Sequence, residues 1–192
     1  SIKKNLLLML KSRQRYFYSM DSSAGTELFS EYIKINSDFL FKLNKEIKSN
    51  TIIRLPHKST DIKSIDFYSN LEKKFNFYSK NTVQEAYSKS KLIIHTMNST
   101  SFLEALSENL PSILILKRKL NPMRSIAKAH MEELYNNNIV FDDPVKAAIF
   151  VNSIWKDNID IWWNSRKNQY AIKKFCGLFA RKRINILGDL KN

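Results

Sequence analysis

The chain has 192 residues, which is enough for one domain with a sizeable hydrophobic core, and 43% of them are hydrophobic, as in ordinary globular proteins. A single cysteine excludes an internal disulfide and a cysteine-based zinc site, and the three glycines form none of the glycine-rich phosphate loops. The net charge is +14. No apolar run approaches the ~20 residues of a membrane span. The single cysteine makes a cytoplasmic location the expectation.

Apolar runs of strand length alternate with amphipathic stretches over the first three quarters of the chain. Residues 6–10 form the first predicted strand, and apolar residues at helical spacing predict a helix over 26–47. Further strands are predicted at 51–55, 75–78, 92–95, 112–116 and 139–141. Helices are predicted at 62–74, 82–88 with Thr82 as its cap, 99–108, and up to Tyr135 with Pro122 in the first turn.

This alternation predicts an α/β fold with a doubly wound, Rossmann-like parallel sheet covered on both faces. The pattern changes after Asp143, where helices are expected over 144–157 and 164–182, joined by 159–163. We therefore expect a nucleotide-binding domain over 1–143 and a C-terminal helical arm over 144–192 that packs back on it. Because the chain starts at Ser1 and not at Met, we also expect it to be cut from a longer protein.

Two polar loops follow predicted strands, where open α/β sheets bind their ligands. One is 54–59, with Arg54 and His57, and the other is 95–101, which opens a helix with Asn98, Ser99, Thr100 and Ser101. Free amides and the positive dipole end of a helix hold phosphate well. We expect the second loop to line a cleft with Arg54 or His57 opposite it.

Each candidate also has a purely structural interpretation, which the sequence leaves open. Ser101 and Glu104 have the spacing of a capping box, although Glu104 could also accept hydrogen bonds from a ribose. His95 fits a core position, and His57 fits an exposed loop that could contact phosphate. The tryptophans are assigned to core or interface. No metal-binding constellation is recognisable.

The positive charge can serve anionic partners, or it can be a general lysine coating of the surface. If it serves an anionic acceptor or a membrane, the cations that follow strands should be neighbours on one face. These cations are Arg13, Arg15, Lys58, Lys117, Arg118 and Lys119.

The segments 87–96 (YSKSKLIIHT), 98–106 (NSTSFLEAL) and 109–113 (NLPSI) resemble the donor-binding domain of GT-B glycosyltransferases. The whole chain resembles the LIC12162-like family of surface-carbohydrate biosynthesis transferases. Three further segments support this resemblance. They are the Arg-Tyr pair after the first predicted strand, residues 54–57 after the second, and residues 143–148, which lead to Trp162 and Trp163.

The resemblance implies a nucleotide-sugar donor as substrate, with no cofactor, and a glycan or lipid-linked acceptor. By position, Ser99 and Thr100 would contact the donor phosphates and Glu104 the ribose. Apart from the resemblance, Arg15 follows the first strand and could reach an anion or be only a surface residue. Pro56 and His57 are similar to the His-Pro pair of CMP-sugar enzymes, although in reverse order. The acceptor-binding N-terminal domain would be missing, so this chain alone would be inactive, and an anionic inner-membrane surface is a further expected partner.

Two other functions compete with sugar transfer. One is a non-enzymatic basic module that binds nucleic acid or anionic membrane, although the dispersed lysines and the lack of an RNA-binding motif speak against nucleic acid. The other is a sugar-nucleotide epimerase of the same architecture, which would need catalytic carboxylates that the sequence does not reveal.

Overall fold

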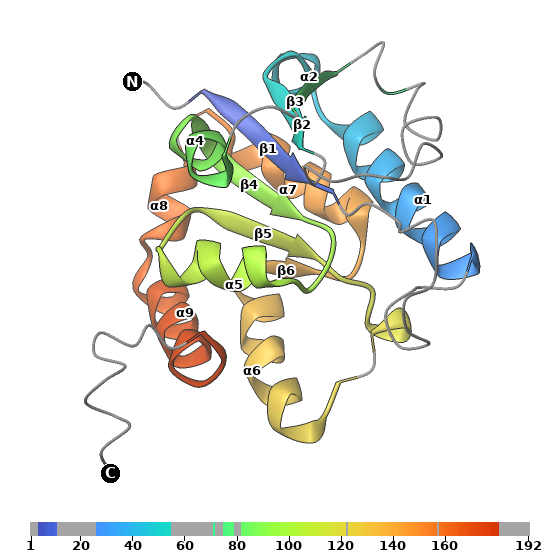
Figure 1. Ribbon diagram of the computed structural model, residues 1–192. Helices are drawn as coiled ribbons and strands as arrows, with labels where there is room; N and C mark the ends of the chain where they lie inside the picture. Colours follow the sequence, from blue (N-terminus) through green and yellow to red (C-terminus); the bar gives the residue numbers. More distant parts are fainter. Residues whose placement is uncertain are drawn as a thin grey trace.

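A computed structural model describes residues 4–10, 26–54, 71, 75–78, 82–121, 123–156 and 158–180. Its centre is a six-stranded sheet in the order β3-β2-β1-β4-β5-β6, and every pair of neighbouring strands is parallel (Figure 1). The strands are β1 (Asn5–Met9), β2 (Thr51–Arg54), β3 (Asn76–Tyr78), β4 (Ser90–His95), β5 (Ser112–Ile115) and β6 (Val140–Phe141). Helices connect and cover them, which confirms the predicted α/β, Rossmann-like fold class.

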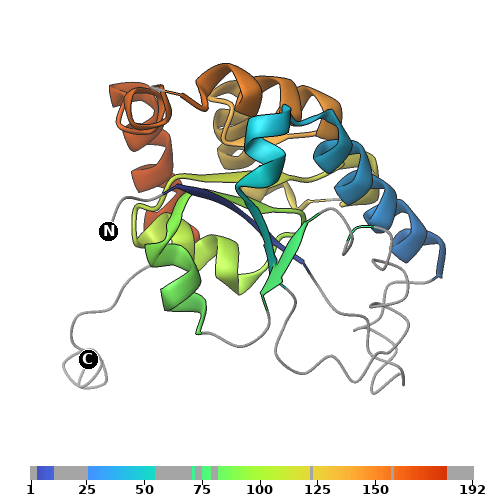
Figure 2. The ribbon, with the colours of Figure 1, turned by 90° about the horizontal axis from the view of Figure 1, so that it is seen from above.

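Helices lie on both faces of the sheet, as Figure 2 shows from above. On one face lie α1 (Thr26–Lys42), α2 (Lys45–Ser49) and α7 (Pro144–Ile154), whose apolar residues form one core cluster with Leu8, Ile53 and Ile94. On the other face lie α4 (Val83–Ser88), α5 (Thr100–Ser107), α6 (Ser125–Asn136) and α9 (Arg166–Phe179), whose core residues are grouped with Leu7, Ile93 and Leu114. Both sides of the central strands are therefore buried, which explains their continuous apolar runs.

The helix predicted over 26–47 is two helices, α1 and α2, with a break between Lys42 and Lys45. Asn152 of α7 holds this break, because its side-chain amide donates to the carbonyl of Lys42 (3.1 Å) and its Oδ1 accepts from the amide of Asn44 (2.9 Å). A contact between residues so distant in sequence leaves no trace in the local apolar spacing.

Helix ends follow the local chemistry of their residues. Thr82 caps α4 in a complete capping box with Glu85, as expected for the cap. Asn109 (φ 54°) and Asn138 (φ 57°) adopt the left-handed conformation just after α5 and α6. There, the amides of Leu110 and Ile139 return to carbonyls five residues back, which is the Schellman arrangement. Helix α6 begins at Ser125 with Arg124 as its N-cap, so its first turn does not include position 122 as predicted, and Pro122 itself lies outside the described residues.

The C-terminal helices pack closely on the rest of the chain. Helix α7 contributes Ala147, Ala148 and Val151 to the core it shares with α1. Residues 159–163, predicted only as a connection, form the short helix α8 (Ile159–Trp163), and α9 packs against α5 and α6. In the described part of the chain, no helix is long and apolar enough to cross a membrane.

Candidate functional site

The strand order creates a switch point between β1 and β4. These two strands are neighbours, yet α1 after β1 covers one face of the sheet and α5 after β4 covers the other. In open α/β sheets, ligands bind in the crevice that such diverging connections leave at the carboxyl ends of the strands. The 95–101 loop leaves β4 at this point, as the sequence predicted from its position after a strand.

Three strand-end residues form a row at this edge. Met9 is the register partner of both Arg54 on β2 and His95 on β4. The residue before each of them, such as Ile53 before Arg54 and Ile94 before His95, packs on the α1 side of the sheet. Because successive side chains of a strand point to opposite faces, Met9, Arg54 and His95 face the side that α4 and α5 cover. Arg54 is only 6% exposed, and its Nη1 donates to the carbonyl of Thr82 at 3.5 Å. A buried guanidinium thus lies on the same face as the start of α5.

The loop after β4 is fixed to α1 and leaves the first turn of α5 with free donors. The buried hydroxyl of Thr96 bonds to the hydroxyl of Tyr32 on α1 at 3.2 Å. Ser99 is the N-cap of α5, but its side chain accepts no bond from a backbone amide of the helix and instead lies 2.8 Å from the Ser101 hydroxyl, Oγ to Oγ. The amide of Phe102 donates to the Ser99 carbonyl at 3.1 Å, whereas the preceding amides of Thr100 and Ser101 have no carbonyl partner within the helix. These two amides remain available to an anion at the positive end of the helix dipole.

The predicted capping box of Ser101 and Glu104 is wrong. Ser99 is the N-cap, which places Ser101 in the first turn of the helix and Glu104 in its middle, exposed to solvent. Thr100 and Glu104 are four residues apart and therefore share a face of α5. Glu104 is thus free of a capping role.

Tyr87 of α4 contacts the start of α5 and lies near Arg54. Its hydroxyl donates to the carbonyl of Ser101 at 3.2 Å. Burial, and secondarily the negative charges of Glu104 and Glu108, raise the pKa of Tyr87 to about 12, against the opposing effect of Arg54. The phenol is therefore neutral at physiological pH, and it lies within electrostatic range of both Arg54 and Glu104.

His95 lies under the first turn of α5. The residue is 1% exposed, and its ring meets that of Phe102 edge to face at 5.4 Å between centroids. Its Nδ1 is 3.5 Å from the Ser101 hydroxyl oxygen, and its buried Nε2 has no hydrogen-bond partner among the described residues. Burial lowers the pKa of His95 to about 3, so the imidazole is neutral at physiological pH.

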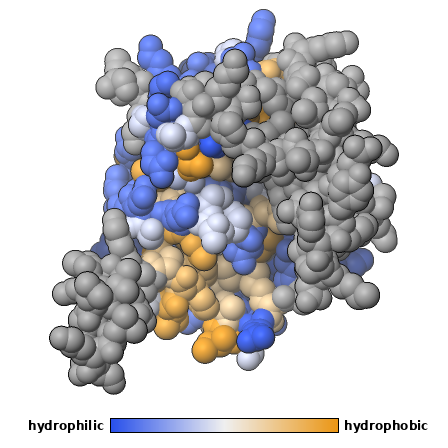
Figure 3. Space-filling model, viewed as in Figure 1, coloured by the Kyte–Doolittle hydropathy of each residue, from blue (hydrophilic) through white to orange (hydrophobic). Residues whose placement is uncertain are grey.

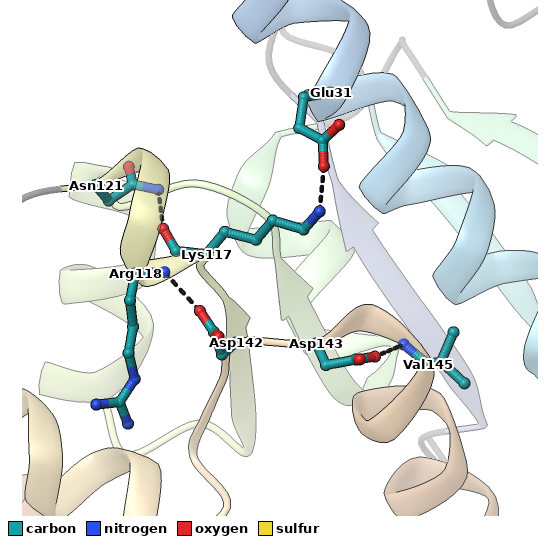
Figure 4. Close-up of polar contacts among 7 residues, drawn as sticks. All are labelled: Glu31, Lys117, Arg118, Asn121, Asp142, Asp143 and Val145. Atoms are coloured by element: carbon teal, nitrogen blue, oxygen red, sulfur yellow. Dashed lines mark hydrogen bonds and ion pairs between the residues drawn. The ribbon is translucent and has the colours of Figure 1, made fainter.

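Two of the cations that follow β5 are held by acids (Figure 4). Lys117 forms an ion pair with Glu31 of α1, and this contact lowers the pKa of Glu31. Arg118 pairs with Glu132, lies 3.9 Å from the ring centre of Tyr135, and donates its backbone amide to Asp142 at 2.5 Å. These contacts tie the β5 loop to α1, α6 and the β6 loop.

The structure brings Arg54, Ser99, Thr100 and Ser101 to one face of the carboxyl edge, with Asn98 exposed in the loop and Glu104 one turn further along α5. His57 and Arg15 lie outside the described residues, as do Arg13 and Lys58. Sequence patterns gave no sign that Tyr87 and Tyr32 belong to the site, and Thr96 was included only as a member of the 95–101 loop. The two tyrosines occur at apolar helical positions, where their spacing gives no sign of the polar contacts made by their hydroxyls.

A separate groove lies at the other end of α5, between that end and α9. Its volume is about 590 Å³, and its walls include Leu106, Asn109, Ile172, Lys173 and Cys176. Apolar residues also gather at the surface over α9 and α6 in Figure 3. The groove contains none of the predicted site residues, so we keep it distinct from the carboxyl-edge site.

Cys176 in this groove provides a pH test of the packing between α5 and α9. Burial raises the pKa of its thiol, and only the thiolate reacts with alkylating reagents. We expect iodoacetamide to modify the folded protein more slowly than the urea-unfolded protein at pH 8, and the difference to shrink at higher pH. Because Cys176 is the only cysteine, mass spectrometry follows it directly. Equal rates at pH 8 would contradict the half-buried placement.

The family model described as LIC12162 family transferase matches residues 1–192. No curated protein matches the chain.

Proposed function

The chain belongs to the LIC12162 family of transferases, and from this premise we propose that it is the donor-binding part of a glycosyltransferase. It is the family that the whole chain resembles, and the segments between 87 and 113 resemble the donor-binding domain of GT-B glycosyltransferases. The proposed substrate is a nucleotide-sugar, with a CMP-linked sugar as the first donor to test. The proposed acceptor is a surface polysaccharide or a lipid-linked glycan on the cytoplasmic side of the membrane.

The observation that carries the proposal is the start of α5 at the switch point. The first-turn amides have no side-chain cap, and the buried guanidinium of Arg54 lies on the same face of the sheet. Amides, hydroxyls and a guanidinium are the donors that bind phosphate oxygens in proteins. The two hydroxyls of Ser99 and Thr100 add to this set.

In the proposed complex, the phosphate of the donor lies against the first turn of α5, and Glu104 accepts hydrogen bonds from the ribose hydroxyls. Breaking the bond between sugar and phosphate leaves additional negative charge on the phosphate. Donors fixed by the fold stabilise that charge without reorganisation during the reaction. We further propose that another domain binds the acceptor and supplies the catalytic base.

Replacing Ser99 and Thr100 together with alanine tests this site. We expect the affinity for the preferred nucleotide to fall by about 1–3 kcal/mol, the scale of hydrogen bonds to charged groups. Isothermal titration with CMP, UDP and ADP, on the wild type and the double variant, measures it. Stability should change little, because the Ser99 side chain makes no capping bond.

Replacing Ser107 and Ser153 with alanine gives a matched control, because both hydroxyls donate only to carbonyls of their own helices. This variant should keep the wild-type affinity. Unchanged affinity in the Ser99 and Thr100 variant would remove the loop from the site, and failure of the wild type to bind any of the three nucleotides would overturn the proposed function.

A further inference from the structure

We propose that His95 is a positioning residue that orients the hydroxyl groups of Ser101 and Ser99 toward the donor phosphate. The inference rests on the proposed nucleotide-sugar site and adds to it a buried residue that touches no substrate. Three polar groups carry it, in a continuous line from the core to the loop: the His95 ring, 3.5 Å from the Ser101 hydroxyl, and the Ser101 hydroxyl, 2.8 Å from that of Ser99.

The position of the proton on the His95 ring determines which group donates and which accepts in the hydrogen bonds from His95 to Ser101 and Ser99. His95 is enclosed, with Phe102 against its ring, and within the part of the chain that the structure describes Nε2 has no partner. A proton on Nε2 would therefore leave a buried N–H donor unsatisfied, which is rarer and more costly in proteins than an acceptor without a partner. The favoured tautomer carries the proton on Nδ1, so that the ring donates to the Ser101 oxygen.

The remaining hydrogen bonds follow from that donation. Once the Ser101 oxygen accepts from His95, its own proton is directed to the Ser99 oxygen. The Ser99 proton is then left to point away from both serines, beside the free amides at the start of α5. In this arrangement Ser99 is a hydrogen-bond donor at the loop, which suits a phosphate oxygen. The opposite tautomer would draw both serine protons toward the core.

The test compares three variants in titrations with whichever of CMP, UDP and ADP binds the wild type most tightly. His95→Leu keeps the apolar packing and removes the donor, and Ser101→Ala breaks the line at its next member. Each is expected to raise the dissociation constant about tenfold, since each weakens a hydrogen bond to a charged group. His95→Asn offers an amide donor near the position of Nδ1 and should remain within about threefold of the wild type.

The double variant His95→Leu with Ser101→Ala should bind no more weakly than either single variant, because both interrupt the same line. His130 on α6 gives a matched control. It is a second histidine with a buried ring nitrogen that has no partner among the described residues, and its ring packs against Phe179 on α9. His130→Leu should keep the wild-type affinity. If His95→Leu does not fold, as judged by circular dichroism, His95→Phe, which keeps an aromatic ring and also removes the donor, takes its place in the same coupling test.

Three results would overturn the inference. They are additive losses in the double variant, a loss in His95→Asn as large as in His95→Leu, or full affinity in His95→Leu while the wild type binds nucleotide. The last result would leave the proposed function standing. If the wild type binds no nucleotide, the proposed function and this inference both fail.

Discussion

Replacing Trp163 with alanine is expected to lower the free energy of unfolding by about 3–5 kcal/mol, the usual range for a fully buried tryptophan. Trp163 is 1% exposed and belongs to the core cluster that holds α5, α6 and α9 together. Its indole Nε1 also donates to the backbone carbonyl of Asn109 at 3.1 Å and to its side-chain oxygen at 3.0 Å. The substitution therefore leaves a large cavity and removes the support of the α5 C-terminus.

Urea unfolding followed by circular dichroism measures this loss. Tyr170→Ala is the control, because Tyr170 is an aromatic residue of the adjoining helix α9 that is 65% exposed, and its loss should change stability by less than about 0.5 kcal/mol. Trp163→Phe should recover most of the packing and lose only the two indole contacts. If Trp163→Ala costs no more than Tyr170→Ala, Trp163 of α8 does not pack in the core between α5, α6 and α9 as described.

The general fold was predictable because its signals are local. The strands around Leu7, Ile93 and Ile113 are buried on both faces, so they appear as uninterrupted apolar runs, and the alternation with helices indicates a parallel sheet. Thr82 was recognisable as a cap because its partner Glu85 is three residues away. Each of these inferences depends on neighbours within one helix or strand.

The failed predictions involve tertiary contacts. The start of α5 could be any of several consecutive small polar residues. In the structure, the buried bond between Thr96 and Tyr32 accompanies a start at Thr100, which makes Ser99 the N-cap in place of Ser101. Likewise, the end of α1 is held by Asn152. Such contacts join segments between 64 and 110 residues apart, so spacing rules do not detect them.

The candidate site was predictable in part. A polar loop after a strand indicated the right edge of the sheet, but only the strand register shows that Arg54 and His95 flank Met9 on one face. Likewise, Lys117 and Arg118 were grouped with the anion-binding candidates, whereas the structure pairs them with Glu31 and Glu132. For His57 and Arg15, which lie outside the described residues, nucleotide contact stays a prediction.

Replacing Arg54 with glutamine is expected to raise the dissociation constant for the preferred nucleotide by about 10- to 100-fold. Arg54 is only 6% exposed, so its charge is poorly screened by solvent, and a hydrogen bond from it to phosphate contributes about 1.5–3 kcal/mol. Arg54→Lys keeps the charge but loses the planar fork and reach of the guanidinium, so its affinity should lie between that of the wild type and that of Arg54→Gln. Titration calorimetry at two salt concentrations measures both variants.

Arg118→Gln is the matched control for Arg54→Gln, because Arg118 also follows a strand of the sheet but already pairs with Glu132 and stacks on Tyr135. It should leave nucleotide affinity unchanged and lower stability slightly. Arg54 donates to the carbonyl of Thr82 as well, so urea unfolding of Arg54→Gln must accompany the titration to separate loss of fold from loss of binding. If Arg54→Gln folds normally and binds as tightly as Arg118→Gln, the guanidinium does not contact the donor. The anion site would then consist of the first turn of α5 without a cation from β2.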